Sequence, residues 1–234
     1  MKPILFNTEM VRAILDGRKS CTRRVIKFPV NRYTNNVPLA DKVVVQELRC
    51  DKVNFLEEPF FSYGMNLPYQ PGDILYVRET WQYLYELDGN EQVIEDTGKY
   101  YYAATDTIPF NTYVDENGVR HDHAPWRPSI HMPKEAARIW LKVTDVRVER
   151  LQDITPKDAE NEGVGNLFYE DIGYSEKNYG TEVDPEYGIA KEQFSWLWDS
   201  TIKKSDLDRY GWEANPWVWI IKFERCDKPE SEGN

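Results

Sequence analysis

Hydrophobic residues at helical spacing predict three short helices in this chain. The first covers residues 8–15, where an apolar stripe follows Thr8, a residue type that caps helices, and Gly17 then marks the end. The second runs from 155 to 163, because a Thr-Pro opening provides a cap and a preset first turn, and a glycine follows. The third covers residues 191–202, in which aromatic and aliphatic side chains share one face.

Alternating or continuous apolar runs predict that strands make up most of the ordered chain. They are expected over residues 25–26, 43–45, 60–61, 74–81, 100–104, 138–151 and 217–223. The run 138–151 is long and breaks its alternation near Thr144, as a bent strand or a hairpin would. Because strands and helices do not alternate regularly, the pattern favours an α+β, strand-dominated fold whose sheet curves into a partly closed β-barrel with short flanking helices.

Two polar stretches interrupt these elements as long insertions. Residues 31–70 mix short strand-like runs with Asn, Pro and Gly, and residues 82–125 are rich in Tyr, Asp, Asn and Gly, without a repeat or low-complexity signal. Residues 1–226 are therefore expected to form a single domain with two insertions. A flexible tail is expected at 227–234.

Composition and charge narrow the classes of function. The 234 residues are 41% hydrophobic, enough for a packed core, and the net charge of −11 argues against a protein that coats nucleic acid non-specifically. The three cysteines at 21, 50 and 226 include no closely spaced pair, so neither a disulfide framework nor a thiolate metal site is indicated. No apolar stretch approaches the length of a membrane span. We expect a cytoplasmic protein that uses no metal or other cofactor.

Residues 17–24, Gly-Arg-Lys-Ser-Cys-Thr-Arg-Arg, concentrate positive charge in this acidic chain, and we refer to them as the octet. The octet follows a helix end and is expected to form a loop that leads into the strand at 25–26. Lys19 places an amine three residues before the hydroxyl of Thr22. Three guanidinium groups stand beside them, on Arg18, Arg23 and Arg24. This combination suits an anionic or carbonyl-bearing ligand, whereas charge runs in general more often form a solvated face.

Further candidates for ligand binding lie in the strand at 74–81 and in a proline-bracketed run at 126–133. They are Tyr76, Glu79, Trp81, Trp126 and His131. The two tryptophans could stack on a planar ligand. An ion pair at a sheet edge is an equally good reading of Glu79, and His131 could be a general acid or make an ordinary structural hydrogen bond.

The octet, the runs 70–81 and 126–133, and the ending 211–223 together resemble the ASCH-domain family of PUA-like proteins. The resemblance is greater to the long phage and prophage branch, whose members are often labelled morphogenetic proteins. In compact bacterial members, which resemble amidohydrolases of N4-acetylcytidine, the signature Gly-x-Lys-x-x-Thr-x-Arg carries the catalytic lysine and threonine. It falls here on Gly17, Lys19, Thr22 and Arg24. The catalytic glutamate of the family, in Thr-x-x-x-Ala-x-x-Glu, matches Glu162.

The resemblance implies a hydrolase of a modified nucleoside or nucleotide, with Lys19, Thr22 and Glu162 as catalytic residues and a PUA-like barrel as the fold. Family members regarded as RNA-binding modules or ribonucleases keep a second option open, in which the octet binds RNA or a nucleotide without acyl chemistry. A third option is a phage assembly or host-interaction protein whose aromatic, acidic insertions contact a protein partner. The chain would act in the bacterial cytoplasm, encoded by a phage or prophage.

Overall fold

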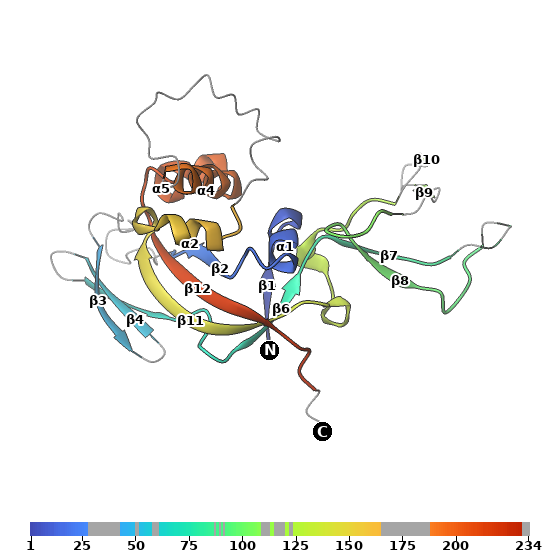
Figure 1. Cartoon of the computed structure of the whole chain (residues 1–234), viewed down its shortest axis with the longest axis horizontal. Helices are drawn as coiled ribbons and strands as arrows, with labels where there is room; N and C mark the ends of the chain where they lie inside the picture. Colours follow the sequence, from blue (N-terminus) through green and yellow to red (C-terminus); the bar gives the residue numbers. More distant parts are fainter. Residues whose placement is uncertain are drawn as a thin grey trace, which may run out of the picture. The chain divides into compact units, whose positions relative to one another are not determined.

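The computed structural model of the chain divides into two compact units (Figure 1). Unit 1 consists of Met1–Asp16, Ile74–Leu141 and Arg225–Asn234, and unit 2 consists of Gly17–Asp73 and Lys142–Glu224. The structure describes residues 1–27, 43–49, 52–57, 61–86, 88, 90, 92–108, 113–114, 120–121, 124–164 and 188–230. Three predicted features lie partly outside the described residues. They are the rest of the two insertions, residue 60 of a predicted strand, and residues 231–234 of the predicted tail.

Unit 1 begins with β1 (Lys2–Leu5), which pairs in parallel with β6 (Ile74–Arg78). The helix predicted next is confirmed as α1 (Thr8–Leu15), but it is capped one residue earlier than predicted. Asn7 has an extended backbone, and its side chain accepts a hydrogen bond of 2.8 Å from the amide of Met10. Two adjacent residues of capping type make this boundary ambiguous in the sequence.

An antiparallel hairpin of β7 (Trp81–Leu84) and β8 (Lys99–Tyr102) follows in unit 1. The strand predicted at 100–104 is confirmed as β8 and the one predicted at 74–81 as β6, whereas most of β7 lies in the predicted insertion. Shorter elements are β9 (Tyr113–Val114), β10 (Arg120–His121) and the 3-10 helices η2 (Ser129–His131) and η3 (Lys134–Ala136). The core of this unit is a buried cluster of Trp81, Met132, Ala136, Ala137 and Trp140.

Unit 2 contains β2 (Cys21–Val25) and most of β11 (Trp140–Arg150) and β12 (Trp217–Cys226). The bent element predicted at 138–151 is thus a single strand. Because β2 starts at Cys21, the second half of the octet is strand, and the predicted loop is wrong there. The reason is that β12 pairs with these polar residues in antiparallel register.

A separate antiparallel sheet in unit 2 consists of β3 (Val43–Arg49), β4 (Lys52–Glu57) and β5 (Phe61–Asn66). The helical elements of the unit are η4 (Leu151–Asp153), α2 (Pro156–Asn161), α4 (Gly188–Thr201), η6 (Lys204–Asp206) and α5 (Leu207–Tyr210). The predicted start of α2 is confirmed, since the hydroxyl of Thr155 accepts from the amide of Asp158 at 3.1 Å and Pro156 follows the cap.

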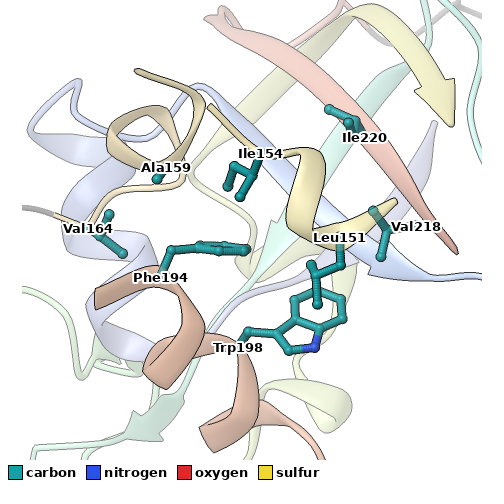
Figure 2. Packing of buried hydrophobic residues seen from close by; sticks show 8 residues of the cluster. All are labelled: Leu151, Ile154, Ala159, Val164, Phe194, Trp198, Val218 and Ile220. Carbon is teal, nitrogen blue, oxygen red and sulfur yellow. The ribbon is translucent and has the colours of Figure 1, made fainter. Parts of the chain in front are cut away.

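The core of unit 2 fixes the end of α2. Figure 2 shows the rings of Phe194 and Trp198, one helical turn apart on α4, directed toward the aliphatic side chains of the cluster. The cluster consists of Leu151, Ile154, Ala159, Val164, Phe194, Trp198, Val218 and Ile220. Since Ala159 and Val164 flank the last turn of α2, this packing holds residue 162 between them in a defined place.

The fold class is confirmed as α+β, dominated by strands and with few short helices. The largest sheet has the order β1-β6-β11-β12-β2 and is mixed, because β1 and β6 run parallel while β12 and β2 run antiparallel. Pairings among the described strands do not close any sheet into a barrel. None of the helices in the described ranges is both long enough and apolar enough to cross a bilayer.

Candidate functional site

The predicted amine and carboxylate meet in unit 2. Lys19 and Glu162 form an antiparallel β-bridge, and Nζ of Lys19 donates to Oε2 of Glu162 at 2.8 Å and to its main-chain oxygen at 2.8 Å. Both residues are only 3% exposed. A buried charge is tolerated when it has an opposite charge and hydrogen bonds, and this pair has both. The lysine also compensates the negative end of α2, beside which Glu162 lies.

Backbone contacts hold the first half of the octet in place. The amide of Ser20 donates to the carbonyl of Asn161 at 2.9 Å, and the carbonyl of Ser20 accepts from the amide of Phe223 at 2.9 Å. Nη1 of Arg18 donates to the carbonyl of Gly163 at 3.0 Å, at the end of α2. Arg18 therefore supports the turn that carries the carboxylate, while its contact with a ligand stays a prediction.

Arg23 contacts the second oxygen of the Glu162 carboxylate. Its Nη1 donates to Oε1 at 3.1 Å, and its guanidinium carbon lies 5.7 Å from the centroid of the Phe194 ring. Both carboxylate oxygens of Glu162 are thus engaged by cations of the octet. Within the described residues, Nε and Nη2 of Arg23 are buried without a hydrogen-bond partner, and Nη2 has the carboxylates of Asp158 and Glu149 at 3.8 and 4.0 Å.

An outer layer of charge surrounds Arg23, and sequence reasoning missed it. Asp158 lies within ion-pair distance of Arg147, at 3.5 Å, and of Lys222, at 3.8 Å. Arg147 also pairs with Asp145 and Glu149 on β11. A signal for this layer exists, because charges alternate in sign at every second residue from 145 to 149 and so share one face of a strand.

Thr22 is buried in β2, 2% exposed, in register with Ile221 of β12. Side chains alternate along a strand, so Thr22 and Arg24 share one face of β2 and Arg23 lies on the other. Lys19 precedes β2 and is not constrained by this alternation. Direct contacts therefore join Lys19, Arg23 and Glu162, and Thr22 is the buried neighbour of Arg23 along the strand.

Arg24 lies in the electrostatic range of Glu162 and of a residue that sequence reasoning did not single out, Tyr69. Burial lowers the pKa of the Arg24 guanidinium, and the charges of Glu162 and then Tyr69 oppose this shift. Burial likewise raises the pKa of Tyr69, an effect that Arg24 opposes. Tyr69 therefore lies within electrostatic range of Arg24 in unit 2.

The thiol of Cys21 is excluded as a nucleophile by its surroundings. Burial raises the pKa of Cys21 to about 12, and the negative charge of Glu162 adds to this while Lys19 and Arg23 oppose it. Its Sγ lies 3.7 Å from the carbonyl oxygen of Asp158. Because the thiolate is the reactive form, a thiol that stays protonated across the physiological range is chemically inert.

Two of the remaining candidate residues are engaged inside unit 1. Glu79 is 1% exposed, and its two carboxylate oxygens accept from Nε and Nη2 of Arg138 at 2.9 Å each. Trp81 is 5% exposed, and the guanidinium of Arg127 lies 5.4 Å from its ring centroid. Glu79 and Trp81 therefore each contact an arginine of unit 1, and their contact with a ligand stays a prediction.

The other three candidates, Tyr76, Trp126 and His131, also lie in unit 1. Tyr76 is half-buried, and its ring centroid is 6.1 Å from that of Trp140. Trp126 and His131 are exposed. Contact between these residues and a ligand stays a prediction.

No family model, no curated protein and no solved structure matches this chain. Function therefore has to be inferred from the groups that meet around Glu162. A buried ammonium and carboxylate joined by a short hydrogen bond are able to exchange a proton, and the buried hydroxyl of Thr22 lies three residues along the chain from the amine.

Proposed function

We propose that this chain is a hydrolase of the ASCH, PUA-like type that removes an acyl group from the amine of a modified nucleoside or nucleotide. The observation that carries the proposal is the buried ion pair of Lys19 and Glu162. These two residues lie 143 positions apart, and they are the lysine and glutamate that the resemblance implies as catalytic. Buried ionisable pairs are frequent at catalytic sites, and the proposal takes the nucleophile from Thr22, three residues from the lysine along the chain.

Acylation begins with a proton shift inside the ion pair. The Lys19 ammonium gives a proton to the Glu162 carboxylate across their 2.8 Å hydrogen bond, which leaves a neutral amine and a carboxylic acid. The amine then removes the proton of the Thr22 hydroxyl as the hydroxyl oxygen attacks the acyl carbon. Glu162 donates its proton to the departing amine of the base, so an acyl-threonine forms and the ion pair is restored.

Water completes the reaction with the same two groups. The Glu162 carboxylate takes a proton from water as the water oxygen attacks the acyl-threonine, and the Lys19 ammonium returns a proton to the leaving oxygen of Thr22. Glu162 then passes its proton back to Lys19, and the released acid loses its proton to solvent. The cycle consumes one amide bond and one water and yields one amine and one carboxylate.

Arg24 is the residue that we assign to the ligand. It shares a face of β2 with Thr22, and a guanidinium in that place can bind a phosphate or the carbonyl oxygen of a pyrimidine. Arg18 and Arg23 act instead as positioning residues, because Arg18 donates to the main chain and Arg23 to the carboxylate at the end of α2. No cofactor enters this scheme.

Release of acetate from N4-acetylcytidine tests the proposal. Thr22→Val removes the hydroxyl while keeping the shape of the side chain, and it should lower the rate by about 10³-fold or more. Thr22→Ser keeps a hydroxyl and should retain turnover, which serves as the matched control. Equal rates for wild type and Thr22→Val would contradict the proposal, as would a wild-type protein that releases no acid from a panel of acylated nucleosides.

A second candidate function is the binding of RNA or a nucleotide without bond cleavage. It is favoured by the saturation of Glu162, whose two carboxylate oxygens and main-chain oxygen already accept from Lys19 and Arg23, as in a structural ion pair. In this case Arg24→Ala should abolish salt-sensitive binding of a labelled oligoribonucleotide, measured by fluorescence anisotropy. Thr22→Val should leave that binding unchanged.

A further inference from the structure

One face of the β7–β8 hairpin of unit 1 carries a row of aromatic rings. The ring centroid of Tyr100 lies 5.8 Å from that of Trp81 and 4.7 Å from that of Tyr83, and Tyr85 continues the row at 5.2 Å from Tyr83. The row begins at the buried Trp81 and ends at Tyr85, which is 44% exposed. Tilted and edge contacts of this kind fix the orientation of each ring.

At the exposed end of this row lies an open groove of about 620 Å³. It is lined by Tyr83, Tyr85, Val93, Glu95 and Asp96. Two of these five side chains are aromatic and two are acidic, and none of the five is basic. Aromatic faces and carboxylates both attract cations, so the chemistry of the groove is selective for positive charge.

The loop that carries the two carboxylates is held by hydrogen bonds. The amide of Ile94 donates to the carbonyl of Glu86 at 2.9 Å, the amide of Glu86 donates to Oγ1 of Thr97 at 2.9 Å, and that hydroxyl donates to the carbonyl of Ile94 at 2.7 Å. Asp96 adopts the left-handed backbone at φ +66°, within the same turn. The carboxylates are therefore presented by an ordered turn, which lowers the entropy cost of binding.

The glycine at residue 98 sets the position of the Tyr83 ring. A β-carbon at Gly98 would lie 2.0 Å from the hydroxyl oxygen of Tyr83, so the ring rests against the bare backbone just before β8. Any larger residue at this position would displace the ring. A substitution at Gly98 would therefore move Tyr83, which lines the groove, without replacing any of the lining residues.

The same unit already binds a guanidinium with these two kinds of group. The guanidinium carbon of Arg138 lies 3.9 Å from the centroid of the Tyr102 ring, and two of its nitrogens donate to the Glu79 carboxylate at 2.9 Å each. A tyrosine face and a carboxylate thus suffice here to bind an arginine. The exposed groove offers two tyrosines and two carboxylates in one place.

We propose that the groove binds an arginine side chain of a partner protein. A planar guanidinium stacks on tyrosine and pairs bidentately with a carboxylate, which an ammonium cannot do. A protein partner is indicated by the surroundings, since Tyr85, Val93 and Ile94 expose 44, 55 and 40% of their surface at the same hairpin end. Clustered exposed apolar side chains of this kind mark protein contacts.

A titration with short peptides tests this inference on the full chain. The probe is acetyl-Gly-Arg-Arg-Gly-amide, and the readout is the NMR shift of carbon-labelled tyrosine rings. We expect saturable shifts of Tyr83 and Tyr85 in the millimolar range or tighter. The same peptide with citrulline, a neutral isostere, should bind at least about tenfold more weakly, because it lacks the charge.

Variants with a matched control locate the site. Glu95→Gln and Tyr85→Ala should each weaken binding of the arginine peptide by about tenfold. Glu86→Gln removes the same charge from an exposed residue of the hairpin that does not line the groove, and it should leave the affinity unchanged. Gly98→Ala should also weaken binding, because it displaces Tyr83.

Several results would overturn the inference. They are the absence of a saturable shift with the arginine peptide, equal binding of the citrulline peptide, and an equal loss in Glu86→Gln and Glu95→Gln. Tighter binding of tetramethylammonium than of the arginine peptide would instead identify a site for small quaternary cations and would also overturn it. The inference is independent of acyl chemistry, since Thr22→Val should leave peptide binding unchanged.

Discussion

A single carboxylate, that of Glu162, receives one cation on each of its two oxygens, from Lys19 and Arg23. In the proposed reaction the two cations have different tasks. Lys19 can give up a proton, whereas Arg23 keeps its own and so holds the carboxylate in place through the cycle. Arg23 therefore fixes one carboxylate oxygen of Glu162 and leaves the other to the bond with Lys19.

Cys21 gives a prediction at the scale of one residue. Its thiol should resist iodoacetamide in the folded protein at pH 9, because burial raises its pKa to about 12. Cys226 is less buried and should be modified under the same conditions, which peptide mapping by mass spectrometry would show. Modification of Cys21 at the rate of Cys226 would contradict this.

The same thiol makes stability depend on alkaline pH. An unfolded cysteine ionises near its ordinary value of 9.0, and the folded one only near 12. The unfolded state therefore loses its proton first, so the stabilisation is complete below pH 9 and decreases as the pH rises toward 12. The urea midpoint of the wild type should fall over this range more steeply than that of Cys21→Ala.

Residue contacts were predictable from the sequence to different degrees. The pairing of Lys19 with Glu162 was expected only from the resemblance described above, since two residues 143 positions apart carry no local signal for it. The contact of Arg23 with Glu162 depends on which face of β2 meets α2, and this is set by the register with β12. Tyr69 was missed because its relation to Arg24 is a matter of tertiary packing.

At the scale of elements, helix ends were predicted where a local cap exists. The boundaries of α2 follow from the hydroxyl of Thr155, the ring of Pro156 and the glycine at 163. From Cys21 onward the octet forms a strand and not the predicted loop, because the charged residues Arg23 and Arg24 are paired with β12. A pairing between strands nearly 200 residues apart overrides local preference in a way that spacing alone does not reveal.

Gly163 gives a prediction at this scale. Its φ of +92° is open to glycine and strained for other residues, so Gly163→Ala should lower the free energy of unfolding by about 1–2 kcal/mol. Because Glu162 precedes it directly, the variant should also slow any acyl release. Urea denaturation measures the first effect, with Glu160→Ala, an exposed residue of α2, as the control. Equal stability of the two variants would contradict the role of this turn.

At the scale of the whole chain, charge opposes broad contact with nucleic acid. The net charge of −11 repels phosphate, while positive side chains gather in the octet. Recognition of a small nucleotide at one point is compatible with this distribution, and coating of a duplex is not.

This distribution gives a prediction for the intact protein. A random DNA duplex at physiological salt should bind more weakly than about 10⁻⁴ M, because few lysines and arginines can displace counterions together. Fluorescence anisotropy with a labelled duplex would measure it. Micromolar binding that declines steeply with salt would show instead that the acidic surface leaves an extended basic path.

Lys19 makes a second hydrogen bond, to the main-chain oxygen of Glu162. The position of the amine therefore does not depend only on the carboxylate that neutralises its charge. Every amino acid has that main-chain oxygen. A substitution at residue 162 therefore removes the carboxylate that pairs with Lys19 but keeps this hydrogen-bond acceptor. A related sequence could therefore lose the carboxylate at this position and still hold Lys19 in the same place. Such a site would be inactive although its backbone looked almost unchanged.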